Sequence, residues 1–383
     1  MGGMERGGTP AEKAADLAGW LACGVLALLA LRMGEGWAHR HFLPAWAYGW
    51  DVQLRILMVL RLLPAVVGLA VLLLLRPWLI RALRSGRGRQ ALFTLLTSGL
   101  AVVASLAVTE GVLRTATWRP VQERWDQEPV RTREPLYGWG FLPNHAGAVR
   151  LDGRNIHYAT GPYGYRAPAA GVGVDLAKPT IVFAGESLVF GYGLDWPDTI
   201  PAQVQAITGV QAANIAINAH AIDQTYLRLR AELPRFRRPV ALVVPFIART
   251  FDRNLDRDRP HLDASLRWHP AEPPPLRLVE MARRVTRYRS TASIEQGTLM
   301  TRAALARIFA LGQARGARPL LLVPQFLPES EREREVRRDV LDAAHIHYLL
   351  VPLPADERSP SHGHPNPRGA RRIAEAVAAA LRR

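Results

Sequence analysis

Cysteine and lysine are almost absent from this sequence of 383 residues. It contains one cysteine, Cys23, and two lysines, Lys13 and Lys178. A single cysteine excludes a disulfide within the chain, and because Cys23 lies in an apolar run, thiolate chemistry is excluded from the rest of the sequence. Cysteine content therefore says nothing about the redox compartment, which has to follow from the membrane topology.

Because lysine is so rare, nearly all of the 49 basic residues are arginine, and the formal net charge is +16. A basic chain raises the question of nucleic-acid binding. However, no tract interleaves basic and aromatic residues in the manner of a groove that binds single strands. Arginine clusters such as that at residues 283–289 are more simply solvated faces of a helix or loop. We therefore expect no nucleic-acid partner.

Apolar residues make up 49% of the chain, and they are concentrated before about residue 116. Three apolar stretches approach the ~20 residues that are needed to cross a hydrocarbon core of ~30 Å. The sequence thus predicts a transmembrane anchor over residues 1–116 with spans at about 17–33, 56–80 and 91–110. A cleaved signal peptide fits poorly because three spans follow one another. The alternative is a hydrophobic helical domain in a soluble protein.

The short connections between the spans predict the orientation of the anchor. The second connection is rich in arginine, whereas the first has only Arg40 between the spans, together with aromatic residues that suit an interface. The basic residues of the second connection are Arg76, Arg81, Arg84, Arg87 and Arg89. We therefore expect a protein of the inner (cell) membrane with a cytoplasmic N-terminus. Everything after the third span then lies in the periplasm or outside the cell.

The remainder of the chain predicts an α/β domain. Residues 117–136 are polar and resemble a linker, 137–170 form a small β-rich lead-in, and 171–383 alternate apolar strands with helices. The expected strands are Thr180–Ala184, Ala212–Ile217, Val240–Phe246, Pro319–Val323 and Tyr348–Pro352. The expected helices are Ile200–Ile207, Gln224–Leu233, Thr298–Arg315, Glu329–Ala344 and Pro367–Arg382. This alternation favours a three-layer α/β/α fold with a mostly parallel sheet, and the stretch from about 250 to 296 is an excursion without clear periodicity.

Ser187 follows a predicted buried strand almost at once. Residues 181–191 read Ile-Val-Phe-Ala-Gly-Glu-Ser-Leu-Val-Phe-Gly. A strand that ends at Gly185 places Ser187 at the rim of the sheet, where reactive groups gather in such folds. The spacing is not the G-x-S-x-G elbow of α/β-hydrolases. A serine at a strand end also serves as a cap or turn residue, and this motif alone leaves both interpretations open.

His364 lies in a loop rich in glycine and proline, directly before the last predicted helix. Residues 361–369 read Ser-His-Gly-His-Pro-Asn-Pro-Arg-Gly. A histidine held in such a loop suits a general base, although it is also compatible with a surface loop. A metal site at His362 and His364 is the other alternative, but no carboxylate or cysteine stands beside them at ligand spacing. We expect neither a metal nor another cofactor.

Taken together and in this order, these motifs resemble the SGNH (GDSL) hydrolase superfamily over about residues 137–383. The family's Gly-Asp-Ser block corresponds to Gly185-Glu186-Ser187, and its final histidine corresponds to His364. The resemblance implies a catalytic pair of Ser187 and His364. It also implies that Ala219 replaces the glycine of the oxyanion hole and that Arg249 or Thr250 occupies the position of the oxyanion asparagine.

The sequence departs from the family at the carboxylate of the triad. His362 or Ser361 occupies that position, and Asp356 or Glu357 is a substitute if the chain loops back. An orienting carboxylate fixes the tautomer of the base, and its loss can cost ~10⁴ in rate in a Ser-His-Asp triad. The possible orienting groups are therefore His362 and Asp356.

The resemblance implies a membrane-anchored serine esterase or O-acyltransferase that works through an acyl-enzyme. Its expected substrate is an acylated carbohydrate or another ester, with acetyl or other small acyl groups on an envelope or exported polysaccharide. The expected partners are the membrane and proteins of polysaccharide biosynthesis or export. One alternative is a catalytically degenerate domain that binds glycan. A deep pocket, with Ser187 and His364 far apart, would support it. The other is a scaffold with a large exposed apolar patch.

Overall fold

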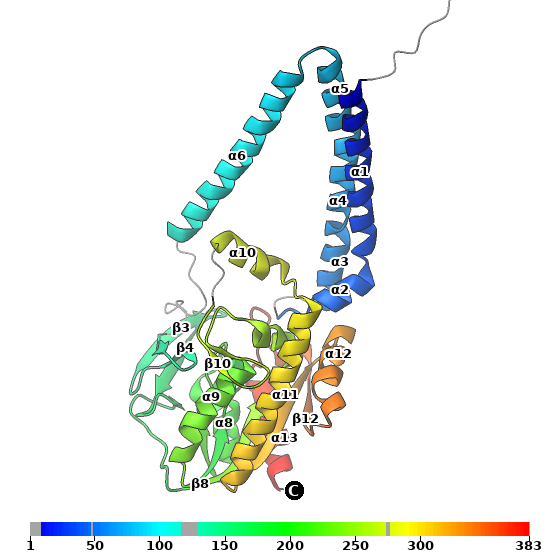
Figure 1. Cartoon of the computed structure of the whole chain (residues 1–383). Coiled ribbons are helices and arrows are strands. Elements are labelled where there is room, and N and C mark those ends of the chain that lie inside the picture. The colour runs from blue at the N-terminus through cyan, green and yellow to red at the C-terminus, as the bar shows by residue number, and fades with distance from the viewer. Residues whose placement is uncertain (1–8, 47–48, 116–128, 273–275, 383) are drawn as a thin grey trace, which may run out of the picture. The chain divides into compact units, whose positions relative to one another are not determined.

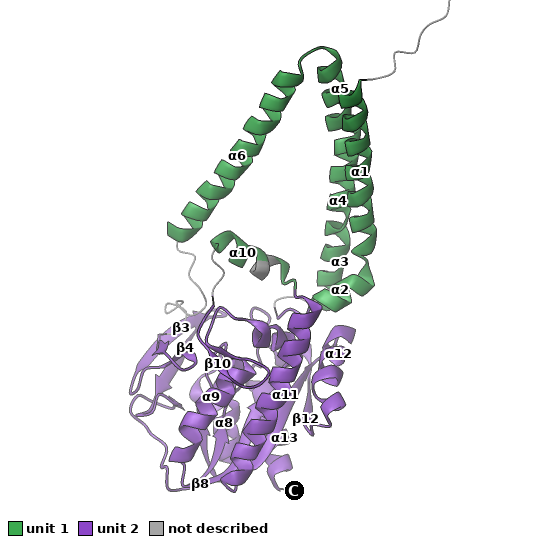
Figure 2. Ribbon diagram, in the orientation of Figure 1, with its two compact units in different colours: residues 1–42, 50–118, 275–288 green, residues 43–49, 119–274, 289–383 purple. Residues whose placement is uncertain are grey.

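The computed structural model describes residues 9–46, 49–115, 129–272 and 276–382, with only the backbone of 283–285. The chain forms two compact units, drawn in different colours in Figure 2. The first comprises residues 1–42, 50–118 and 275–288, and the second comprises residues 43–49, 119–274 and 289–383. The three consecutive prolines at 273–275 and residues 117–128 of the expected linker lie outside the described residues.

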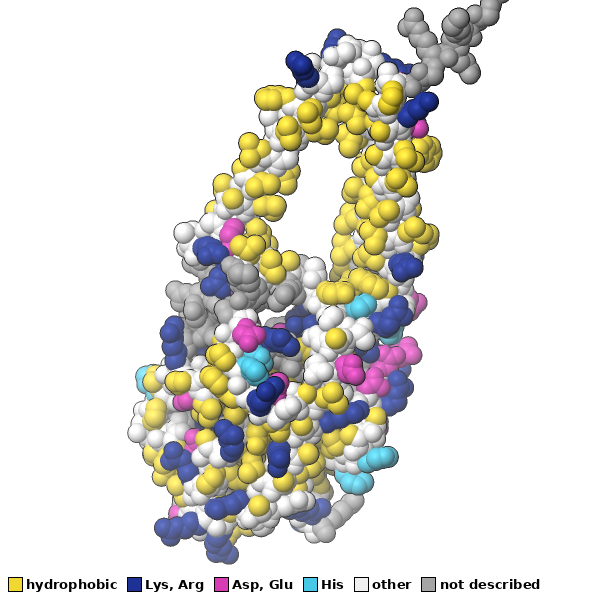
Figure 3. Space-filling model, in the orientation of Figure 1, with side chains coloured by type: hydrophobic (Ala, Val, Ile, Leu, Met, Phe, Trp, Pro, Cys, Tyr) yellow, Lys and Arg dark blue, Asp and Glu magenta, His cyan; other side chains and the backbone are white. Residues whose placement is uncertain are grey.

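The first unit contains three helices that are long and apolar enough to span a membrane. They are Pro10–Arg32, Trp50–Arg84 and Gly88–Thr115, with 23, 35 and 28 residues. The first and third are α1 and α6, and the second is a succession of α3 (Trp50–Leu60), α4 (Leu62–Ala70), the π-turn η1 (Val71–Leu75) and α5 (Arg76–Arg84). Their apolar side chains face outward, as Figure 3 shows. The three predicted apolar helices are therefore confirmed, and they fit a membrane anchor.

Helices α1 and α4 pack side by side (Figure 1) because small residues line their contact. A Cβ atom added to Gly68 would lie 3.3 Å from Cα of Cys23, so glycine allows this close approach. At the start of α5, Nε of Arg76 donates to Oδ1 of Asp16 on α1 at 2.6 Å. Charged side chains within an apolar helix pair usually meet each other in this way.

The first unit also includes two short helices, α2 (Glu35–His41) and α10 (Arg277–Thr286). The carboxylate of Glu110 on α6 accepts hydrogen bonds from the N–H groups of Arg277 (3.0 Å) and Leu278 (2.9 Å), which have no partner within their own helix. The expected excursion from about 250 to 296 therefore contains a helix that the sequence analysis did not predict.

The second unit is built on an eight-stranded sheet in the order β12-β11-β8-β6-β7-β5-β4-β3. The first five strands of this order are parallel, and the last three are antiparallel. In chain order the strands are β3 (Ala146–Leu151), β4 (Arg154–Thr160), β5 (Arg166–Ala167), β6 (Pro179–Phe183), β7 (Gln211–Asn214), β8 (Arg238–Pro245), β11 (Arg318–Phe326) and β12 (Leu349–Leu353). Strands β3, β4 and β5 of the β-rich lead-in therefore extend the main sheet.

Helices cover both faces of this sheet, which confirms the predicted α/β class. They are α8 (Ile200–Thr208), α9 (Ile222–Glu232), α11 (Thr291–Ala314), α12 (Glu331–Val340) and α13 (Pro367–Arg382). Helix α8 packs against α13, and α9 packs against α11. The chain moves from β6 to β7 on one side and later returns to β8 on the other side of β6. With right-handed crossovers, this reversal places α8 and α9 on opposite faces and makes the carboxyl end of β6 the topological switch point.

Several boundaries differ from the sequence predictions for local reasons. Residues 131–134, expected in the linker, form β1 (Arg131–Glu134), which pairs with β2 (Gly138–Phe141). Helix α11 begins seven residues earlier than predicted, at Thr291, because the Ser290 hydroxyl accepts a hydrogen bond from the N–H of Ser293 at 3.2 Å. The rest of the expected excursion holds η6 (Ala248–Leu255) and the hairpin of β9 (His261–Leu262) and β10 (Trp268–His269).

The segment Leu43–Trp46 belongs to the second unit, although it lies between α2 and α3 in sequence. Leu43 is part of the hydrophobic core of the second unit with 2% of its surface exposed, and Trp46 packs against that core. The segment that connects the first two apolar helices is thus a structural part of the α/β unit.

Candidate active site

The end of β6 positions Ser187. Gly185 has a φ of +138°, and a Cβ atom there would lie 2.4 Å from Cδ of Pro245, so only glycine fits this turn. Ser187 follows as the first residue of the short helix α7 (Ser187–Phe190) and is 6% exposed. The predicted rim position is the carboxyl end of β6, where the winding direction of the sheet reverses.

The loop before α13 brings His364 to Ser187. The Ser187 hydroxyl lies 2.8 Å from Nε2 of His364, which is hydrogen-bond distance. The loop is held by a hydrogen bond from the N–H of Ser359 to the carbonyl of His364 at 2.8 Å. The imidazole lies between two aromatic rings, with centroid distances of 4.7 Å to Trp46 and 4.9 Å to Tyr192. The two residues that the sequence analysis singled out therefore form a buried Ser–His pair.

His362 occupies the position where a triad would place its carboxylate. Its Nδ1 lies 3.2 Å from Nδ1 of His364, and its carbonyl oxygen lies 3.1 Å from the same nitrogen. On the other side of the ring, Nε2 of His362 lies 3.5 Å from Oδ2 of Asp152. The carboxylate of Asp152 is thus connected to His364 through a second imidazole.

The hydrogen bonds assign one consistent set of tautomers to this chain. The N–H of His364 donates to Nδ1 of His362 at 3.4 Å, which makes that nitrogen an acceptor. The proton of His362 is then on Nε2 and faces Asp152, while the proton of His364 is on Nδ1 and faces His362. Nε2 of His364 is left as the acceptor for the Ser187 hydroxyl, which is the state that a general base needs.

The surroundings keep the histidines neutral. Burial, together with the nearby His362 and Arg253, lowers the pKa of His364 from 6.5 to about 3. Burial also lowers the pKa of His362, and Asp152 counteracts part of that effect. The pKa of Asp152 is itself lowered by hydrogen bonds from Ser359 and Ser361 and by His362, so the carboxylate is ionised.

Gly193 lies against the second imidazole. Its φ is +79°, and a Cβ atom there would lie 2.7 Å from Nε2 of His362. Glycine is thus required both by the backbone conformation and by the close approach of the ring. This glycine helps to keep His362 between Asp152 and His364.

Ala219 lies where the resemblance places a glycine of the oxyanion hole. The N–H of Ile217 donates to the carbonyl of Gly185 at 3.0 Å, which holds the chain leading to Ala219 beside the turn before Ser187. Ala219 adopts a φ of +63°, which favours glycine. Among the residues that the structure describes, neither the N–H of Ala219 nor that of Ser187 has an acceptor.

Arg249 is engaged elsewhere. Its Nε donates to Oε1 of Glu333 at 2.5 Å, and its guanidinium lies 5.1 Å from the ring centroid of Phe326. The neighbouring Thr250 hydroxyl donates to the carbonyl of Ile247 at 3.1 Å. The arginine whose charge acts on His364 is Arg253, one helical turn further along η6.

Arg253 pairs with Glu186, the residue that replaces the family's aspartate before the serine. Glu186 is 6% exposed, and burial raises its pKa while Arg253 opposes that effect. This ion pair fixes the carboxylate that immediately precedes Ser187. The sequence analysis did not single out Arg253, because nothing in its local pattern distinguishes it from the other arginines of the chain.

The structure places the remaining orienting candidates away from the base. The side chain of Asp356 is 66% exposed and lies 3.3 Å from Arg368. Glu357 is bound by Arg372 at 2.5 and 2.7 Å. Asp152, which the sequence analysis did not single out, is the carboxylate that lies beside His362 instead. No local motif marks Asp152, because it meets His362 only through the folding of the lead-in onto the sheet.

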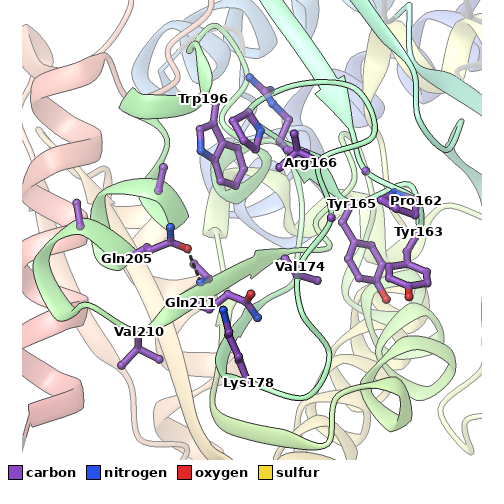
Figure 4. Close-up of a pocket in the computed structure, with 18 of the residues that line it drawn as sticks. Pro162, Tyr163, Tyr165, Arg166, Val174, Lys178, Trp196, Gln205, Val210 and Gln211 are labelled. Atoms are coloured by element: carbon purple, nitrogen blue, oxygen red, sulfur yellow. Dashed lines mark hydrogen bonds between the residues drawn. The ribbon is translucent and has the colours of Figure 1, made fainter.

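A cavity of about 710 Å³ lies at the amino ends of β6 and β7, whereas Ser187 follows the carboxyl end of β6. It is lined by residues at the start of β6 and β7 and by Tyr163, Lys178 and Trp196, which Figure 4 shows around it. Ser187 and His364 do not line it. The amides in its wall also serve the fold, since Gln211 donates to Oγ1 of Thr180 at 2.7 Å.

Comparisons with known proteins give structural similarities only. No family model matches the chain, and no curated protein does. Among solved structures, a lipolytic protein of the G-D-S-L family from Desulfitobacterium hafniense is 13% identical, with a TM-score of 0.35 over 52% of this chain and 98% of that one. A GDSL-like lipase from Bacteroides thetaiotaomicron is 13% identical, with a TM-score of 0.32 over 53% and 87%.

An acetyl xylan esterase from the rumen bacterium Butyrivibrio proteoclasticus is 10% identical, with a TM-score of 0.33 over 55% of this chain and 65% of that one. These proteins are lipolytic proteins and esterases by their descriptions. Because the identities and TM-scores are low, a function for this chain has to depend on the geometry of its own residues.

Proposed function

We propose that this chain is a membrane-anchored serine esterase or O-acyltransferase of the SGNH type. The observation that carries the proposal is the 2.8 Å distance between the Ser187 hydroxyl and Nε2 of His364. The position of this pair at the carboxyl end of β6, with a hydrogen-bonded path to an ionised Asp152, supports the same assignment.

The proposed reaction passes through an acyl-enzyme. The Ser187 oxygen attacks the ester carbonyl carbon, and its proton moves to Nε2 of His364. The ester C–O bond then breaks, and the alcohol leaves with the proton from His364. The N–H groups of Ser187 and Ala219 stabilise the negative oxygen of the tetrahedral intermediate. Water, or a sugar hydroxyl in a transfer reaction, gives its proton to His364 and attacks the acyl carbon. The acyl C–O bond to Ser187 then breaks, and His364 returns the proton to the Ser187 oxygen, which regenerates the hydroxyl and the neutral base.

The imidazolium formed in this reaction needs stabilisation because burial disfavours it. The carbonyl of His362 accepts from Nδ1 of His364, and the ring of His362 connects that nitrogen to Asp152. A neutral imidazole between base and carboxylate transmits the charge less directly than a carboxylate in contact would. A slower enzyme than one with a direct Ser-His-Asp triad is therefore expected.

The proposed site faces away from the cytoplasm. Residues 43–49 join the first two apolar helices in sequence and belong to the same compact unit as the α/β domain. A single compact unit lies on one side of a membrane. With three spans, the connection between the first two helices and the chain after the third lie on the same side, as this requires. The arginine-rich connection around Arg81 and Arg84 is then cytoplasmic. A reporter that is active only outside the cytoplasm should therefore be active when it is fused after Arg383.

The proposed substrate is an acetylated or otherwise acylated carbohydrate of the envelope or of an exported polysaccharide. The outward orientation of the site supports this class, and the acetyl xylan esterase among the similar structures acts on such an ester by its description. Proteins of polysaccharide biosynthesis or export are the proposed partners. Whether water or a sugar is the acceptor is decided by product analysis with and without added acceptor sugar.

The test is ester turnover by the full-length chain in detergent, with p-nitrophenyl acetate and an acetylated polysaccharide. Ser187→Ala and His364→Ala should each lose about 10³-fold or more in kcat. Ser265→Ala and His145→Ala are matched controls, since both side chains are exposed and lie outside the site. Equal turnover in all five proteins, or none in the wild type, would reject the catalytic assignment.

A degenerate domain that binds glycan is the second candidate. The cavity of about 710 Å³, with Trp196 and Tyr163 in its lining, favours it. The short distance between Ser187 and His364 counts against it, since a binding domain does not need that pair. Glycan binding by a wild type that is catalytically inert would favour this candidate.

A further inference from the structure

The imidazole of His364 is covered by a residue from a distant part of the sequence. Trp46 lies in the segment between the first two apolar helices, and its ring centroid is 4.7 Å from that of His364. The same indole lies 5.3 Å from the ring of Phe326. Trp46 and His364 belong to the same compact unit, so this contact is internal to it.

The indole also makes a hydrogen bond to the loop that carries the base. Nε1 of Trp46 donates to the carbonyl of His362 at 2.8 Å. That carbonyl is also an acceptor for Nδ1 of His364, at 3.1 Å. One oxygen is thus held between the indole N–H and the base. Its position decides both the direction of the His364 ring and the tautomer that leaves Nε2 free for Ser187.

We propose that Trp46 is a positioning residue for the base, so that the active site is incomplete without the segment between the first two membrane helices. The inference rests on the proposed function, and it deepens that function by adding a residue of this segment to the surroundings of the base. Trp46 acts through His362 and by covering His364, without contacting the Ser187 hydroxyl.

Two variants separate these two actions in the full-length chain. Trp46→Phe keeps an aromatic ring over His364 but removes the N–H. The loss of this partly buried hydrogen bond should lower kcat about tenfold, with KM nearly unchanged. Trp46→Ala also exposes His364 to water, which should move the acid limb of kcat/KM to higher pH. The charged, titratable and aromatic groups near His364 besides Trp46 are His362, Arg253 and Tyr192, and neither variant changes them.

Trp268→Phe is the matched control. Nε1 of Trp268 donates to the carbonyl of Leu136 at 2.9 Å, so this variant removes the same kind of hydrogen bond from the β9–β10 hairpin. Its kcat and pH profile should equal those of the wild type. Wild-type kinetics in Trp46→Phe, or an equal loss in Trp268→Phe, would overturn the proposal while leaving the esterase assignment intact.

A measurement without turnover keeps the two proposals apart. Diethyl pyrocarbonate modifies neutral imidazoles, and peptide mass spectrometry follows its reaction with His364 as a function of pH. The midpoint should move to higher pH in Trp46→Ala relative to the wild type and to Trp268→Phe. An unchanged midpoint would overturn the role of Trp46, whether or not the wild type hydrolyses an ester. Absence of ester hydrolysis by the wild type would instead reject the esterase assignment.

Discussion

Oδ2 of Asp152 lies 3.5 Å from Nε2 of His362, and the opposite nitrogen of that ring faces the base His364. The carboxylate comes from the turn between β3 and β4, more than two hundred residues before the loop that holds the two histidines. The lead-in strands thus contribute to the site as well as to the sheet. An ionised carboxylate at this distance favours the tautomer of His362 that accepts from His364.

Asp152→Asn tests this path from carboxylate to base. The amide is neutral, so it stabilises the imidazolium less, and kcat should fall about tenfold. This loss is smaller than that in His364→Ala because the base itself remains. Asp356→Asn is the control, since that carboxylate is exposed and should leave kcat unchanged. If both aspartate variants behave as the wild type does, Asp152 has no part in orienting the base.

The acid limb of kcat/KM should lie well below 6.5, the ordinary pKa of histidine. Burial lowers the pKa of His364, so its neutral form persists as the pH falls, and activity is lost only when the pH approaches the lowered value. The profile is measured by stopped assays, with a return to neutral pH to show that the loss is reversible. A reversible limb near 6.5 would mean that His364 is hydrated in the working enzyme.

Arg249→Gln separates an oxyanion donor from a structural ion pair. Loss of a donor to the oxyanion typically costs 10²–10³ in kcat, whereas Arg249 is bound to Glu333 in this structure. We expect kcat to change less than about threefold and the free energy of unfolding to fall by about 1–3 kcal/mol. Glu333→Gln should give a similar loss of stability in a thermal melt. A hundredfold fall in kcat without loss of stability would restore Arg249 to the oxyanion hole.

Ala219→Gly should leave stability unchanged or raise it by up to about 1.5 kcal/mol. The left-handed conformation costs an alanine ~1–2 kcal/mol, and glycine avoids this at an entropic cost of ~0.5–1 kcal/mol. The backbone N–H that is proposed to bind the oxyanion is kept, so turnover should be retained. Ala216→Gly is the matched control: its φ is not positive, and it should lose about 1 kcal/mol. Equal destabilisation by both variants would show that the φ of Ala219 carries no strain.

The sequence predicted the elements whose hydrophobic pattern is local. The strand before Ser187, the helix after His364 and the three apolar helices all follow from periodicity within short windows. The pair of Ser187 and His364 was predicted because the two motifs, taken together and in this order, resemble those of the SGNH family. Boundaries set by a single cap, such as Ser290 at the start of α11, were missed.

The parts of the site that depend on distant contacts were not predictable. Asp152 lies in a turn, and Trp46 lies in the connection between the first two apolar helices. No local sequence pattern at either residue predicts a contact with the loop near residue 364. Arg249 was named from its place after a strand, yet its length allows it to reach Glu333 on α12. Backbone position follows from sequence pattern more readily than the direction of a long side chain does.

Covalent trapping on Ser187 tests the central claim most directly. The full-length chain is treated with a fluorophosphonate, which forms a stable adduct with an activated serine, and the modified residue is identified by peptide mass spectrometry. The account predicts an adduct on Ser187 in the wild type, none in Ser187→Ala and much slower labelling in His364→Ala. A wild type that remains unlabelled, or an adduct on another serine, would contradict the assignment of Ser187 as the nucleophile.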